Sequence, residues 1–257
     1  MAQTTKISWA TSTWNPWIGC SKISEGCFHC YAEHNVAALM RRGGRVQWGP
    51  GQPRAKTKDW AKILSWNRRA EKTGEDIQVF PSLCDIFDAD PAQEVTLDAW
   101  REELFELIRS TPALTWLLLT KRPEVAAESR WADQISEFGA NVWIGVSAEN
   151  QDRANDRLPI LVNDIPSMNK FVSAEPLLGP LDLTPWLGRI QWVIVGGESK
   201  RAARPMDLDW ARSVRTQCAR ADARFYFKQV GGSDRDHGGE FLDGELVQEE
   251  PDWNIAS

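Results

Sequence analysis

The sequence predicts an α/β fold, a parallel sheet that forms a full or partial (βα) barrel of the TIM type. Three observations lead to this prediction. Short apolar runs recur along the chain, and most are continuous rather than alternating, as in strands that are covered on both faces. Stretches with a helical spacing of apolar residues separate the runs. The runs number about seven, which is close to a barrel and too many for a small flavodoxin-like sheet.

The expected strands are spaced so that a helix fits between most of them. The first strand is expected near residues 13–18, and the stretch YAEHNVAALMRR at residues 31–42 is expected to be helical. Strand-helix alternation of this kind predicts βαβ units with right-handed crossovers. The later strands are expected at 77–84, 115–120, 142–147, 171–176, 192–199 and 225–229.

Two stretches carry an apolar stripe at helical spacing. One precedes the run at 115–120, and a weaker one precedes the run at 225–229. A stripe of this kind predicts a helix that packs one face against the sheet. The stripes consist of Leu97, Trp100, Leu104, Leu107 and Ile108, and of Leu208, Val214 and Cys218.

Length and composition narrow the class of protein. The chain has 257 residues, 42% of them hydrophobic, which is enough for a core of full size, and no internal repeat or linker divides it. We therefore interpret residues 1–257 as a single barrel domain. The N-terminus lacks a basic-then-apolar signal pattern, and no apolar run approaches the roughly 18 residues that cross a bilayer. These features predict a cytoplasmic protein with no membrane partner.

Charge is distributed unevenly along the chain. The net charge is -6, yet residues 41–72 carry ten basic and two acidic side chains, with Trp48, Trp60 and Trp66 among them. Such a basic, tryptophan-bearing insert fits contact with a nucleic acid, and it also fits a solvated helix beside a glycine-proline loop. The chain ends in an acidic, glycine-rich tail at about residues 231–257.

Polar or charged side chains follow the expected strands at their C-terminal ends. Because the carboxyl ends of parallel strands meet at one face, where such folds carry their chemistry, we expect these side chains to line one polar cavity. A cavity with carboxylates and cations suits a charged ligand that forms hydrogen bonds. The candidates for catalysis are Asp85, Lys121, Glu175, Glu198 and Lys228.

Three of the five cysteines lie within eleven residues, directly after the first expected strand. In a reducing compartment, clustered thiols are more often metal ligands or catalysts than disulfides. Cys20, Cys27 and Cys30 have no obvious fourth ligand, which favours a four-iron, four-sulfur (4Fe-4S) cluster with one iron open to another molecule. Zinc is the alternative, with His29 and His34 as possible ligands, although His29 lies between two cysteines, where reaching the same ion strains the loop.

The remaining cysteines and one histidine have simpler interpretations. Cys84 ends an expected strand and could approach the site, but a buried free cysteine usually behaves as a small hydrophobic residue. Cys218 belongs to an apolar helical stripe and is expected in the core. His237 lies in a glycine-rich acidic loop and is expected to be exposed.

The cysteine loop and the motifs after it resemble a known family. A three-cysteine loop after the first strand of a (βα) barrel, with an aromatic residue after the last cysteine, resembles the radical S-adenosylmethionine (radical SAM) superfamily. The chain is similar, more closely, to a largely uncharacterised phage and bacterial family of three-cysteine proteins that is usually assigned to that group. The shared motifs, from about Trp14 to Pro251, are TWNPWIGCSKISEGCFHCYAE, SLCDIFD, LLLTKRP, WIGVSAEN, FVSAEPLLGPLDL, VIVGGES, FYFKQVGG and the terminal LDG.

This resemblance implies a barrel of the radical SAM type, in which Cys20, Cys27 and Cys30 hold a 4Fe-4S cluster. S-adenosylmethionine (SAM) would bind the open iron and, after one-electron reduction by a reductase or a flavodoxin-type donor, yield methionine and a 5′-deoxyadenosyl radical. Six residues separate the first two cysteines instead of the superfamily's usual three, a difference that a bulged loop can accommodate. The residues expected to contact SAM by their positions after the strands are Ser147, Glu149, Asn150 and Arg122.

The resemblance also suggests a substrate. Phage-associated radical SAM proteins include enzymes that remodel hypermodified thymine in phage DNA, for example by isomerising an amino-acid adduct on the base. The specific expectation is therefore an isomerase that acts on a flipped-out DNA base in the host cytoplasm. A nucleotide, a transfer RNA or a peptide is the alternative substrate. A non-catalytic, zinc-containing nucleic-acid-binding protein is the alternative outside the enzymes.

Overall fold

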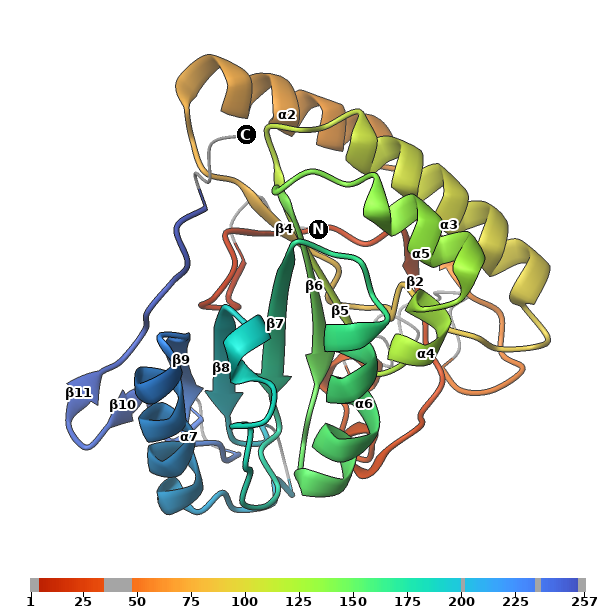
Figure 1. Cartoon of the computed structure of the whole chain (residues 1–257). Coiled ribbons are helices and arrows are strands. Elements are labelled where there is room, and N and C mark those ends of the chain that lie inside the picture. Colours follow the sequence, from red (N-terminus) through yellow and green to blue (C-terminus); the bar gives the residue numbers. More distant parts are fainter. Residues whose placement is uncertain (1–4, 35–47, 200–201, 234–236, 254–257) are drawn as a thin grey trace.

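A seven-stranded parallel sheet forms the centre of the computed structural model, which describes residues 5–34, 48–199, 202–233 and 237–253. The strands lie in the order β1-β4-β5-β6-β7-β8-β9, so neighbours in the sheet also follow one another along the chain. Such an order winds in one direction, as in a barrel, and has no point at which it reverses. Figure 1 shows the sheet curled into a half barrel. The predicted α/β fold with a parallel sheet is confirmed, in a form compatible with a partial TIM-like barrel.

Most strands lie where the apolar runs predicted them. The runs at 115–120 and 142–147 coincide with β5 and β6, whereas β4 and β8 end before their runs do because the chain leaves the sheet to form cavity loops. The strands are β1 (Ser12–Thr13), β4 (Gln78–Phe80), β5 (Thr115–Thr120), β6 (Val142–Ser147), β7 (Asn169–Ala174), β8 (Trp192–Gly196) and β9 (Arg224–Gln229).

Helices cover the outer face of the curled sheet (Figure 1). The two predicted apolar stripes fall in α3 and α7. A helix is also expected at residues 31–42. Residues 31–34 are helical, and the rest of that stretch lies outside the described residues. The helices are α2 (Trp60–Thr73), α3 (Glu94–Arg109), α4 (Pro123–Ala126), α5 (Ser129–Ser136), α6 (Gln151–Asn163) and α7 (Leu208–Ala221), with 3₁₀ turns η1 (Glu25–Cys27) and η2 (Leu187–Arg189). None of these helices is long and apolar enough to span a membrane.

The two faces of the sheet bury separate apolar clusters. Along β5, Trp116 and Leu118 pack outward against the helices, while Leu117 and Leu119 point into the half barrel, as the two-residue period of a strand requires. The inner cluster is aromatic near the start of the strands, and Trp9 of the N-terminal segment joins it at ring-centroid distances of 4.4 Å to Phe80 and 6.0 Å to Trp192. This cluster fills the half barrel at the N-terminal end of its strands.

The C-terminal segment lies along the outer edge of β9. Val247 accepts a backbone hydrogen bond from Phe227 at 2.7 Å, and a short hairpin of β10 (Phe241–Leu242) and β11 (Glu245–Leu246) precedes this pairing. Trp253 then packs its ring 5.3 Å from the rings of Trp143 and Trp192. The described part of the expected acidic tail thus covers an edge strand, which would otherwise expose unpaired backbone groups, and contacts the inner aromatic cluster.

The described part of the basic insert has two separate locations. A small sheet joins β3 (Ala55–Lys56) to β2 (Trp17–Ile18) below the cysteine loop, and Arg54 is buried there between Asp88 and Asp90. Farther on, α2 lies near the N-terminal ends of the strands (Figure 1), with Trp66 buried in the outer core. Arg54 and Trp66 are therefore not available to a nucleic acid.

Candidate active site

A cavity opens inside the half barrel at the C-terminal ends of the strands. Its volume is about 160 Å³. Trp9, Phe80 and Leu119 form an apolar floor, and the cysteine loop and the ends of the strands form the walls.

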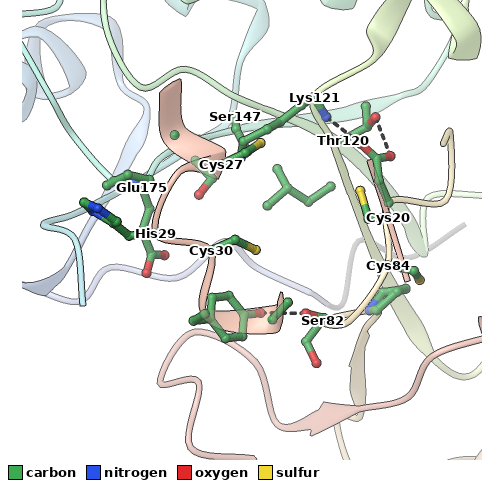
Figure 2. Close-up of a pocket in the computed structure, with 18 of the residues that line it drawn as sticks. Cys20, Cys27, His29, Cys30, Ser82, Cys84, Thr120, Lys121, Ser147 and Glu175 are labelled. Carbon is green, nitrogen blue, oxygen red and sulfur yellow. Dashed lines mark hydrogen bonds between the residues drawn. The ribbon is translucent and has the colours of Figure 1, made fainter. Parts of the chain in front are cut away.

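Four cysteines line this cavity. Figure 2 shows Cys27 and Cys30 on one side of the space and Cys20 and Cys84 on the other. Burial raises the pKa of the Cys20 and Cys30 thiols. In the described part of the chain, no three His, Cys, Asp or Glu side chains lie close enough together to share one metal ion. The thiols therefore surround a space instead of converging on a point.

Arg122 supports the Cys20 end of the loop. Its guanidinium Nη1 lies 3.8 Å from Cys20 Sγ, and its Nη2 donates to the Ser21 carbonyl at 2.7 Å. Asp85 holds Arg122 in turn at 3.1 Å and accepts the Thr120 hydroxyl at 2.7 Å. This aspartate of the loop after β4 thereby fixes the turn after β5, and that turn places a cation against the first cysteine.

Glu149 supports the middle of the loop from beneath. It is fully buried, pairs with Arg157 at 2.8 Å, and accepts the Ser24 hydroxyl at 2.8 Å. Burial alone would raise the pKa of Glu149, but the charges of Lys121 and Arg157 lower it below its usual value. A Cβ atom added to Gly26 would lie 2.4 Å from a carboxylate oxygen of Glu149, so the backbone of η1 rests directly on this carboxylate.

A third carboxylate holds the end of the loop that carries Cys27 and Cys30. Glu198 is bound by His29 Nδ1 at 2.8 Å and by the backbone and side chain of Arg204, which also donates to the Glu25 carbonyl at 2.9 Å. Burial alone would raise the pKa of Glu198, but the hydrogen bonds from Arg204 and His29 lower it to about 2. The side chain of Asn150 binds Glu25 as well.

The remaining charged side chains face the cavity itself. Lys121 Nζ donates to Ser147 Oγ at 2.8 Å and lies 3.4 Å from Glu149. Burial would lower the pKa of Lys121, but the neighbouring Glu149 carboxylate raises it, so its ammonium group stays charged. Lys228 pairs with Glu175 on the part of the wall formed by β7 and β9.

Residues 4–251 match the model of a family described as "Protein of unknown function (DUF5131)". The chain belongs to the DUF5131 family. No match was found among curated proteins or among solved structures. The family match includes every residue that lines the cavity, so the site belongs to the part of the chain that defines the family.

In this DUF5131 protein, most of the residues predicted for the site do lie together. The cavity is lined by Cys20, Cys27, Cys30, Asp85, Lys121, Arg122, Ser147, Glu175, Glu198 and Lys228. Glu149 and Asn150, expected to contact SAM, do not line it, because their side chains bind the cysteine loop from below.

Sequence reasoning missed the residues that hold the loop in place. Gly26 lies between the cysteines and carried a signal, since a glycine there indicates a close approach of the backbone. The others gave none, because the fold decides which of the many charged and polar side chains pair with one another; these residues are Ser24, Arg54, Arg157 and Arg204.

Proposed function

We propose that this DUF5131 protein is a radical SAM enzyme. The observation that carries the proposal is that three thiols of one loop line a cavity at the C-terminal ends of a parallel half barrel. Cys20, Cys27 and Cys30 would hold a 4Fe-4S cluster and leave one iron for SAM. When bound and reduced, such a cluster supplies the electron that cleaves SAM into methionine and a 5′-deoxyadenosyl radical.

The set of donors fits this group. Each cysteine of a 4Fe-4S cluster binds a different iron, so its ligands surround a volume, whereas four zinc ligands converge on one ion at about 2.0–2.3 Å. The thiols here lie on opposite sides of the cavity (Figure 2). Cys84 is a spare thiol in the same cavity and lies 3.9 Å from Asn15 Oδ1. A cluster therefore suits the arrangement better than zinc does.

The protein's own residues would hold the loop rigid and tune the site. Arg122 offers positive charge and a weak hydrogen bond to Cys20, and hydrogen bonds to cluster sulfurs raise a reduction potential. Glu149 and Glu198 fasten the loop from two sides, so that the thiols are preorganised. Lys121 and Ser147 line the cavity next to this loop and are the residues suited to the carboxylate or hydroxyl groups of SAM. The aromatic floor would exclude water from a radical.

For the substrate we propose a base of DNA, remodelled or isomerised after it is flipped out of the helix. The apolar floor and charged walls of the cavity suit a planar ring that carries polar groups. Within the described part of the basic insert, Trp48 lines the cavity and is placed to contact such a base.

Anaerobic reconstitution tests the cluster. We expect the parent protein to bind about four irons and four sulfides per chain and to absorb broadly near about 400 nm. Cys27→Ala should lose most of this iron, whereas Cys218→Ala, which removes a buried thiol outside the cavity, should keep it. A colourless protein that binds zinc through the same cysteines would refute the proposal.

A further inference from the structure

We infer that the ion pair of Glu175 and Lys228 binds the edge of a heteroaromatic base at which a hydrogen-bond donor lies beside an acceptor. This inference deepens the proposed function and rests on it for the identity of the ligands. Both residues line the cavity, and they come from the ends of two strands that flank β8. At this pair a ligand can find an acceptor and a donor together.

The other two carboxylates that line the cavity, Asp85 and Glu198, already have several hydrogen-bond partners within the protein. Asp85 already accepts hydrogen bonds from Thr120, Arg122 and two backbone amides. Glu198 is saturated by Arg204 and His29. These carboxylates hold the loop and the strand ends in place.

Glu175 and Lys228 have hydrogen-bond donors and acceptors that a ligand could use. Within the described residues, each of these side chains has only the other as a hydrogen-bond or ion-pair partner. One carboxylate oxygen and two ammonium protons are therefore left for a ligand. Both side chains are also largely shielded from solvent, at 17% and 16% exposed, so a hydrogen bond made to them meets little competition from water.

Strand β8 lies between Glu175 and Lys228 and carries a glycine where it passes the ion pair. Gly196 of β8 lies between the two residues, and a Cβ atom added there would come within 3.4 Å of Lys228 Cβ and 3.6 Å of Glu175 Cγ. A larger side chain at this position would occupy the space next to the ion pair. The missing side chain thus allows two residues on non-adjacent strands to meet.

The surroundings suit a flat, largely apolar ring. Tyr31 lines the same cavity, and its hydroxyl donates to the Ser82 carbonyl at 2.8 Å, which fixes the ring. Leu119 and Phe80 extend the apolar surface across the floor. Enzymes that act on flipped bases read the base edge through hydrogen bonds and hold its faces against aromatic or apolar side chains.

The charge of the pair selects the ligand class. A ligand with a single charge would compete with one partner for the other and leave one buried charge unpaired, which is costly. A neutral base edge can give its N–H to Glu175 and accept from Lys228 while the pair stays intact. Such an edge belongs both to the adenine of SAM and to a base of the nucleic-acid substrate, and the two sources share this recognition chemistry.

Exchanging the two residues tests the inference. The double variant Glu175→Lys with Lys228→Glu keeps an ion pair but reverses donor and acceptor, so a base held in the same position meets an ammonium group where it offers its N–H and a carboxylate where it offers its acceptor. Lys228→Met serves as a second variant that removes the donor alone. Exchange of Lys56 and Glu103, an ion pair outside the cavity, is the matched control. Calorimetry would measure binding of S-adenosylhomocysteine and of thymidine to the protein as purified and after anaerobic reconstitution, and urea unfolding would check folding.

The expected result is a loss of affinity of about tenfold or more for one probe in both cavity variants, the size expected for a lost hydrogen bond to a charged group, with the control unchanged. Weaker binding of S-adenosylhomocysteine assigns the pair to the adenine of SAM, and weaker binding of thymidine assigns it to the substrate. Unchanged affinity for both probes in the folded variants, or no binding of either probe by the parent, overturns the inference. The proposed function fails separately, through absence of a cluster in the parent protein.

Discussion

Replacing Gly26 by alanine should disturb the support of the cysteine loop. The added Cβ atom would lie 2.4–2.7 Å from three atoms of the Glu149 side chain, distances at which one of the two groups must move. Overpacking of this kind costs about 1–3 kcal/mol. Displacing the carboxylate also loses its 2.8 Å hydrogen bond from Ser24, and such charge-assisted bonds contribute about 1.5–3 kcal/mol. Because the two costs partly overlap, we expect destabilisation by about 3 kcal/mol.

Urea unfolding and iron content measure this effect. Gly26→Ala should lower the free energy of unfolding by about 3 kcal/mol and reduce the iron bound on reconstitution. Gly188→Ala is the matched control, because Gly188 lies in the 3₁₀ turn η2 with no atom within 4 Å of an added Cβ. If Gly26→Ala unfolds and binds iron like Gly188→Ala, then the loop does not rest on Glu149 and this account of its support is wrong.

Three further expectations follow from the same contacts. The hydrogen bonds of Glu198 lower its pKa from the ordinary 4.5 to about 2, so its contribution to stability is complete above about pH 5 and is lost as the pH falls toward 2. The difference in urea midpoint between the parent and Glu198→Gln should therefore be larger at pH 7 than at pH 3.5. An equal difference at the two pH values would contradict this expectation. Cys84→Ala should keep the parent's iron and sulfide content, because three cysteines suffice; loss of the cluster would add Cys84 to its ligands. Trp253→Ala should destabilise the protein by about 2–3 kcal/mol in thermal or urea unfolding, since its ring packs on Trp143 and Trp192; an unchanged midpoint would mean that this packing contributes nothing.

Much of the fold could be predicted because the sheet is buried on both faces. The runs TWLLLT and VWIGVS have no polar interruption, so their bounds at 115–120 and 142–147 agree with β5 and β6. β1 was harder to place, since two residues at the sheet edge leave hardly any pattern. The inner position of Trp9 gave no local signal either, because its partners come from β4, β7 and β8.

The residues of the cavity could be predicted from their places after the strands, whereas their roles could not. Ser147 and Glu149 are two residues apart, and the sequence alone favours the same role for both. The structure directs Ser147 into the cavity and buries Glu149 under the cysteine loop, where Arg157 from the following helix pairs with it. This difference depends on contacts with Ser24 and Gly26, more than a hundred residues earlier in the chain.

Cleavage of SAM tests the proposed function most directly. The reconstituted protein would be incubated with SAM and dithionite without oxygen, and 5′-deoxyadenosine would be measured by chromatography. We expect the parent and Cys84→Ala to form 5′-deoxyadenosine and Cys27→Ala to form none. If the parent protein carries a complete cluster and forms no 5′-deoxyadenosine, or forms as much as Cys27→Ala does, the protein is not a radical SAM enzyme.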